Sequence, residues 1–176
     1  MKIEGIDDFN RALAELTQDL RKKVVRSALR AGMKPIIAHA KAHAPELKTP
    51  HPYRIKGLLR SRIVAATSRI ARSRGEIGIY MKPMPAKGVT KGAKSPLDPF
   101  YYKFVVGGFH AVGRKRVAGG RLTRKLNLSA RVRQGSARFV EGNDFIGDAF
   151  RAKGDEALAA FTRTLKARID AANQRK

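Results

Sequence analysis

Apolar residues recur at spacings of three and four along the first quarter of the chain, and this period predicts an amphipathic helix. The apolar face consists of Phe9, Leu13, Leu16, Leu20, Val24, Ala28, Leu29, Ile36, Ile37, Ala40 and Ala44. Asp7 and Asp8 precede this face and are suited to cap the helix N-terminus. Gly32 and Pro35 predict a kink or a short break, and Pro45 predicts the end of the helix.

The period then changes to two. Residues 46–60 contain further prolines and are expected to form a loop. Two runs alternate between apolar residues and others: Ile63, Ala65 and Thr67 in the first, and Ile77, Ile79 and Met81 in the second. With residues 72–75 between them, these runs predict two strands of a hairpin or meander. Residues 82–99 hold Pro, Gly and Lys and are expected to form a projecting loop outside the core.

Residues 100–106 combine aromatic and β-branched side chains. They predict a third strand, with Tyr102, Phe104 and Val106 on one face, or alternatively a short helix.

Residues 107–138 form a Gly-rich, basic insert, which favours a long loop or a β-arm ordered by a partner. Gly107 and Gly108 at its start are expected to permit a tight turn.

A final helix is expected from about Asp144 to Ala172, with Gly154 placed to divide it. Its buried face is marked by Leu158, Phe161, Leu165 and Ile169. These elements together predict one α+β domain over residues 1–176. In that domain a long N-terminal helix and a C-terminal helix pack on a small antiparallel sheet, and long basic loops or arms project from it.

The distribution of charge along the chain indicates a class of partner. The chain has 38 Lys and Arg against 14 Asp and Glu, a formal net charge of +24. Residues 46–140 hold 22 basic and three acidic side chains, so the expected helices at the two ends are nearly neutral. Such a cationic insert attracts nucleic acid or an acidic protein surface, and charge alone does not separate the two. The candidate polyanion or partner contacts are Arg114, Lys115, Arg116, Arg121, Arg124, Lys125, Arg131 and Arg133.

No pattern in the chain supports a catalytic, metal or cofactor site. His39 and His43 share a helix face, but a zinc protease motif requires Glu directly after the first His, so we interpret them as solvated or interface histidines. Residues 88–95 approach a phosphate-binding loop, yet Ala93 replaces its second Gly and Pro96 follows where a helix must begin. There is no Cys, and no apolar run reaches the length of a membrane span. We therefore expect no enzyme, no cofactor and no membrane contact.

Three patches resemble segments of one protein family. Residues 40–45 (AKAHAP), followed by residues 57–63 (GLLRSRI), are similar to the pattern AK-x-x-AP … G-x-L-x-x-S-I. Residues 101–108 (YYKFVVGG) are similar to Y-x-x-F-x-E-x-G, and residues 143–150 (NDFIGDAF) to the P-F-L-x-P-A-F that opens a last helix. In this order they resemble the HK97 gp10-like phage tail-component family. The chain departs from it at Val106, which replaces Glu, at Asp144 and Asp148, which replace prolines, and in its enlarged basic insert.

The resemblance implies a structural protein of a tailed-phage or prophage virion, made in the bacterial host cytoplasm and located at the neck or tail. It implies a ring-forming subunit that acts in head–tail joining or tail completion. The implied partners are copies of itself, neighbouring neck or tail proteins, and duplex DNA in contact or close by. The residues expected in subunit packing are Tyr102, Phe104, Gly107, Gly108, Phe145, Ile146, Ala149 and Phe150, of which the last four should hold the final helix on the sheet.

Two further expectations accompany this hypothesis. Copies that each carry +24 repel one another, so the isolated protein is expected to be monomeric or to assemble in a salt-dependent way. The alternative function is that of a stand-alone basic nucleic-acid-binding protein, which would bind tightly and with a steep salt dependence.

Overall fold

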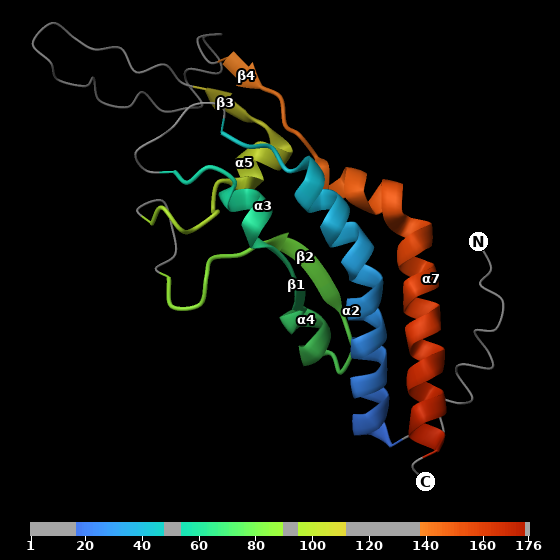
Figure 1. Cartoon of the computed structure of the whole chain (residues 1–176). Helices are drawn as coiled ribbons and strands as arrows, with labels where there is room; N and C mark the ends of the chain where they lie inside the picture. The colour runs from blue at the N-terminus through green and yellow to red at the C-terminus, as the bar shows by residue number, and fades with distance from the viewer. Residues whose placement is uncertain (1–16, 48–53, 90–94, 112–137, 175–176) are drawn as a thin grey trace, which may run out of the picture.

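The computed structural model describes residues 17–47, 54–89, 95–111 and 138–174 (Figure 1). Its elements are α2 (Gln18–His43), α3 (Leu58–Arg62), β1 (Ile63–Thr67), α4 (Arg69–Ser73), β2 (Ile79–Pro83), α5 (Tyr102–Gly107), β3 (Phe109–Ala111), β4 (Arg138–Val140) and α7 (Phe145–Asn173). The predicted α+β class is confirmed, because a long N-terminal and a long C-terminal helix accompany small antiparallel sheets.

The two long helices lie side by side and antiparallel, and α2 stands between α7 and the β1–β2 pair in Figure 1. Two clusters of buried side chains join these elements. One cluster holds Val24 and Ala28 of α2 with Leu165, Ile169 and Ala172 of α7. The other joins both helices to the sheet and contains Met33, Ile36, Ala40, Ala44, Ile63, Met81, Phe145, Ala149 and Ala157. The expected apolar stripe of α7 is buried at Leu165 and Ile169 and partly buried at Leu158 and Phe161.

Helix α2 continues through Gly32 and Pro35 as one helix of 26 residues, so the expected break is wrong. A proline inside a helix removes one hydrogen bond and costs about 3 kcal/mol. Met33 and Ile36, on either side of Pro35, are both buried in the core. Tertiary packing therefore outweighs the local preference. The expected start of this helix, with Asp7, Asp8 and Phe9, lies outside the described residues.

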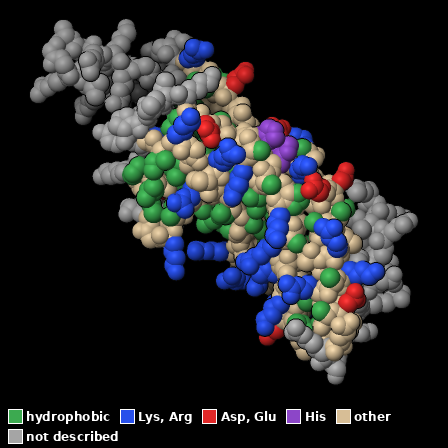
Figure 2. All heavy atoms as spheres, viewed as in Figure 1, with side chains coloured by type: hydrophobic (Ala, Val, Ile, Leu, Met, Phe, Trp, Pro, Cys, Tyr) green, Lys and Arg blue, Asp and Glu red, His purple; other side chains and the backbone are tan. Residues whose placement is uncertain are grey.

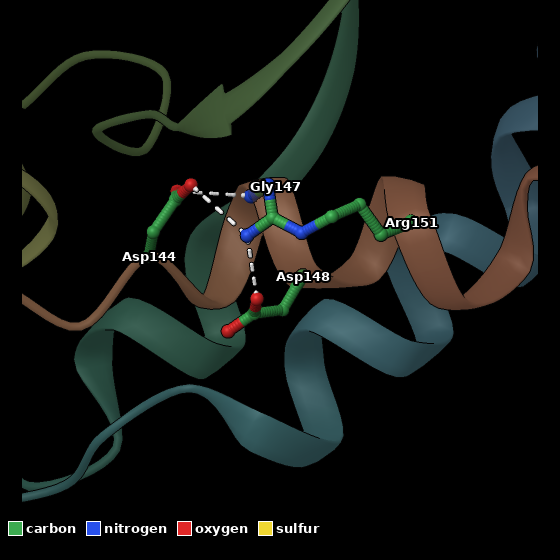
Figure 3. A network of polar contacts seen from close by, with 4 residues as sticks. All are labelled: Asp144, Gly147, Asp148 and Arg151. Carbon is green, nitrogen blue, oxygen red and sulfur yellow. Dashed lines mark hydrogen bonds and ion pairs between the residues drawn. The ribbon is translucent and has the colours of Figure 1, made fainter.

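Helix α7 begins one residue after its cap, Asp144, whose Oδ1 accepts a hydrogen bond from the backbone N–H of Gly147 at 2.9 Å. Figure 3 shows Arg151 reaching back over this turn, 2.6 Å from Asp148 Oδ1 and 3.6 Å from Asp144 Oδ2. The hydrogen bond to Asp148 raises the pKa of Arg151 above its usual value. The expected division occurs at Lys153, which has non-helical backbone angles, directly before Gly154.

Strands β1 and β2 pair antiparallel, with Ala65 opposite Met81 and Thr67 opposite Ile79. The predicted pair of strands is thus confirmed, although Ile77 precedes β2. The connection is longer than a tight turn, because it contains α4, whose first turn is capped by the Ser68 hydroxyl.

Two loop predictions need correction. Residues 58–60 were expected in a loop, but Leu58 and Leu59 are buried in α3, which follows Gly57 in a left-handed conformation. Residues 82–99 were expected outside the core, but Asp98 and Pro99 are buried. The ring of Pro99 fixes its φ angle, so burying this residue costs little conformational entropy. The end of this segment is therefore packed and does not project.

Residues 102–107 form the short helix α5, the second of the two sequence interpretations, and the third strand is not formed there. Strands β3 and β4 then pair antiparallel, with Phe109 opposite Val140 and Ala111 opposite Arg138. Residues 112–137, between these two strands, lie outside the described residues, so the expectation of a long loop or a β-arm there stays a prediction. Gly108 has the positive φ of 72° that the expected turn needs, whereas Gly107 ends α5 without one.

Candidate functional site

The polyanion contacts expected from the sequence, Arg114, Lys115, Arg116, Arg121, Arg124, Lys125, Arg131 and Arg133, all lie outside the described residues. The structure instead brings together a second set of cations that the sequence analysis did not single out, on the two long helices.

Three open hollows follow one another between α2 and α7. The central hollow, of about 440 Å³, is lined by Lys23, Arg26, Ser27, Arg30, Ala31, Lys34, Thr164 and Arg168. It shares Lys23, Ser27 and Arg168 with a hollow of about 410 Å³ toward the start of α2. It shares Ala31, Lys34 and Thr164 with one of about 520 Å³ on the other side, which adds Arg163 and Glu156. The three form one continuous surface, called here the α2–α7 groove.

Among the described residues, carboxylates do not balance the charge of the central hollow of the groove. None of the five cations in its central hollow forms an ion pair with another described residue. Glu156, at one end, lies 2.7 Å from the ammonium of Lys153. The Nε of Arg26 is buried and has no hydrogen-bond partner among the described residues. Figure 2 shows Lys and Arg side chains gathered over the two helices. The groove is therefore an anion-attracting surface.

A sequence signal for part of this groove existed. Lys23, Arg26, Arg30 and Lys34 are spaced by three, four and four residues, which places them on one side of a helix. Arg168 joins them only because α7 packs antiparallel to α2. The charge count concealed the pattern because it was taken over the whole ends of the chain. Helix α2 itself holds a single acidic residue, Asp19, and the other acidic residues that offset its cations in the total lie in residues 1–16 and 141–176.

Four exposed apolar side chains lie on α5, β3 and β4. We call these residues, Phe104, Phe109, Phe139 and Val140, the arm-base patch. Phe104 and Phe139 each keep 51% of their surface exposed. The rings of Phe104 and Phe109 meet edge to face at 6.3 Å, and Phe139 lies 5.1 Å from the ring of His110.

A second apolar surface lies on the outer side of the β1–β2 sheet and on α4, and we call Val64, Ile70 and Tyr80 the sheet-face patch. All three are exposed, Ile70 by 68%. In the sheet, Ala66 stands opposite Tyr80 and Val64 opposite Lys82, whose ammonium lies 5.2 Å from the Tyr80 ring centre. Figure 1 shows that β1, β2 and α4, which carry this patch, lie apart from β3 and β4, which carry most of the arm-base patch.

The remaining residues expected in subunit packing divide into three groups. Phe145 and Ala149 are buried against the sheet and Ile146 packs at its edge, as expected. Phe150 is 43% exposed, so the expectation that it packs α7 onto the sheet is wrong: it lies one position beyond Ala149 and turns away from the core. Tyr102 is partly exposed and Gly107 is exposed at the end of α5.

Two histidines of α2 and one tyrosine before α5 have side chains of types that can take part in catalysis, and their contacts are as follows. The rings of His39 and His43 stack at 4.0 Å, and His43 Nδ1 lies 2.9 Å from the carbonyl oxygen of His39. Burial raises the pKa of Tyr101, and the charge of Arg54 opposes part of that increase. Within the described ranges, no group of three or more His, Cys, Asp or Glu is placed to hold a metal ion. Most of the phosphate-loop-like segment lies outside those ranges.

None of the helices in the described ranges has both the length and the apolar character needed to cross a membrane. Comparisons with protein-family models, curated proteins and solved structures gave no match to this chain.

Proposed function

We propose that this chain is a structural subunit of a tailed-phage virion at the neck or tail, where it forms a ring and acts in head–tail joining or tail completion. One observation carries the proposal. The three patches of family resemblance are far apart in sequence, yet they meet in one core cluster: Ala40 and Ala44 from the first, Val105 and Val106 from the second, and Phe145 and Ala149 from the third. Residues that jointly build one core are those that a shared fold would retain.

The contacts beside this cluster support the same interpretation. Pro45, Leu58 and Tyr101, from the first two patches, line one hollow of about 160 Å³. The backbone N–H of Asn143, in the third patch, donates to the carbonyl oxygen of Val105 at 2.7 Å. Residues of the three patches thus contact one another in and beside the core, next to α5.

Ring assembly requires two different, complementary surfaces on each subunit, because a head-to-tail contact joins unlike patches. The arm-base patch and the sheet-face patch supply two exposed apolar surfaces at separate places. We propose that the arm-base patch of one copy packs on the sheet-face patch of the next.

The test uses one variant in each patch, Phe139→Asp and Ile70→Asp, with Ile55→Asp as a control at an exposed apolar residue outside both. Masses are measured by size exclusion with light scattering at low and high salt, with and without duplex DNA. We expect the wild type and the control to form an oligomer of defined mass once salt or DNA screens the charge. Each patch variant alone should remain monomeric.

An equimolar mixture of the two patch variants is the decisive sample. Each retains the surface that the other lacks, so one interface can form and the mixture should yield dimers that grow no further. An oligomer whose mass is unaffected by either substitution would contradict the proposed contact.

The alternative function, a stand-alone nucleic-acid-binding protein, is favoured by one specific observation, the α2–α7 groove, whose central cations form no ion pair with another described residue. A wild type that remains monomeric at every salt concentration, binds duplex DNA and releases it steeply with added salt would favour this alternative.

A further inference from the structure

We infer that the α2–α7 groove binds the sugar–phosphate backbone of a nucleic-acid duplex. The inference rests on the groove residues alone and does not depend on the ring. It assigns duplex contact to the paired helices, in addition to any contact made by the arm.

The first argument is charge without compensation. Of the residues that the structure describes, five cations and no carboxylate line the central hollow, and Arg163 extends the series along α7. Like charges four residues apart on a helix repel, as Arg26 and Arg30 do, so the free protein keeps this row at a cost in stability. A bound polyanion removes the repulsion, and the condensed counterions that it releases drive association.

The second argument is spacing. Lys23 and Lys34 are eleven residues apart on one helix, which corresponds to about 17 Å along its axis. The backbone of a B-form duplex winds around its axis once in about 34 Å, so the row is as long as about half a turn. Its cations can therefore contact phosphates at more than one point along the duplex.

The third argument is the kind of polar group present. The hydroxyls of Ser27 and Thr164 lie among the cations, and Ser and Thr commonly donate to phosphate oxygens. The buried Nε of Arg26 would gain an acceptor from a phosphate oxygen. These are donors for a backbone, without the geometry to read bases.

The apolar content of the groove separates a duplex from other polyanions. Interfaces between proteins are enriched in aromatic residues and depleted in Lys, whereas interfaces with nucleic acid are strongly positive. The central hollow contains two Lys, no aromatic residue, and Ala31 as its apolar side chain. A single strand would require aromatic rings for base stacking, and the described residues that line the groove include none.

The experiment compares two triple variants of the full-length protein that lose equal charge. The groove triple is Lys23→Ala, Arg30→Ala and Lys34→Ala. The control triple, on and just after α4, is Arg69→Ala, Arg72→Ala and Arg74→Ala. All six side chains are exposed, and the basic insert is unchanged in both variants. Binding to a 30-bp duplex of random sequence is measured by fluorescence anisotropy over a series of NaCl concentrations.

We expect the groove triple to reduce the slope of log affinity against log salt by about 2.7, because each lost phosphate contact removes about 0.9. Its affinity at 0.1 M salt should fall at least tenfold, whereas the control triple should retain the wild-type slope within one unit. Equal losses in the two triples, or an unchanged slope in the groove triple, would overturn the inference.

Three further measurements keep the outcome unambiguous. Circular dichroism must show that both triples melt cooperatively, and light scattering fixes the oligomeric state, so that a failure of the ring proposal leaves the slope comparison intact. Binding to poly-L-glutamate is measured in parallel. If the groove triple loses affinity for poly-glutamate but not for the duplex, the occupant is an acidic protein and the inference fails.

Discussion

Gly32 sets how closely the two long helices approach. A Cβ atom at this position would lie 2.9 Å from the carbonyl oxygen of Ala157 and 3.2 Å from the Cβ of Phe161. Because the nearest atom is backbone, the helices must separate to accept any side chain. Gly32 lowers the local helix propensity of α2, but it also allows α2 and α7 to approach each other closely.

Gly32→Ala is expected to lower the free energy of unfolding by about 1–3 kcal/mol, the range for overpacking a core, despite its gain in helix propensity. Gly154→Ala is the matched control, since nothing lies within 4 Å of a Cβ there. The control should raise stability by about 0.5–1 kcal/mol. Urea unfolding of the three proteins measures both. A stabilising effect of Gly32→Ala would show that the helices are not in close contact at this point.

At the scale of elements, sequence periodicity predicted the parts that are both long and regular. The final helix was expected from about Asp144 to Ala172 and extends from Phe145 to Asn173, because a capping carboxylate and a regular apolar stripe define it locally. The strand runs at 63–67 and 77–81 were recognisable from the alternation of their apolar residues, although β2 begins at Ile79. Helix α4 was missed because its five residues are too few to show a period and depend on the Ser68 cap.

The candidate site was predictable only in part. The spacing of Lys23, Arg30 and Lys34 is visible in the sequence, but a row of cations on a helix is usually just a solvated face. The row becomes part of a candidate binding surface only because α7 places Arg168 and Thr164 in the same hollow. The antiparallel register that does so follows from packing over the whole helix pair, including Gly32, and no local pattern specifies it.

The like-charged row predicts a specific response of stability to salt. Each repulsive pair on α2 costs about 0.2–0.5 kcal/mol at low ionic strength, and salt screens it. Raising NaCl from 0.05 to 0.5 M should therefore increase the melting temperature of the wild type more than that of the groove triple. Thermal melts followed by circular dichroism, with the α4 triple as the reference for general charge loss, measure this. The same salt response in both triples would place the repulsion elsewhere.

At the scale of the whole molecule, the proposed contacts occupy separate surfaces. The groove lies between the two long helices, and the arm-base and sheet-face patches lie on other elements. A duplex and a second copy could therefore bind one subunit at the same time. Neutralising the groove would also weaken the repulsion between copies that each carry +24. If both proposals hold, duplex binding and ring assembly favour each other, and this coupling is necessarily reciprocal.

The short β3–β4 ladder has a consequence for how the chain tolerates change. It brings Ala111 and Arg138 opposite each other, so the frame is closed on both sides of residues 112–137. Closing a flexible connection costs only about 0.6 kcal/mol more for each doubling of its length. Replacing these residues with a Gly/Ser linker of about half the length should leave the urea midpoint nearly unchanged, and loss of cooperative unfolding would contradict this. The β3–β4 pair would then stay formed whichever segment connects its strands. Recombination or engineering could therefore replace this segment, and with it the binding partner, without changing how the rest of the chain folds.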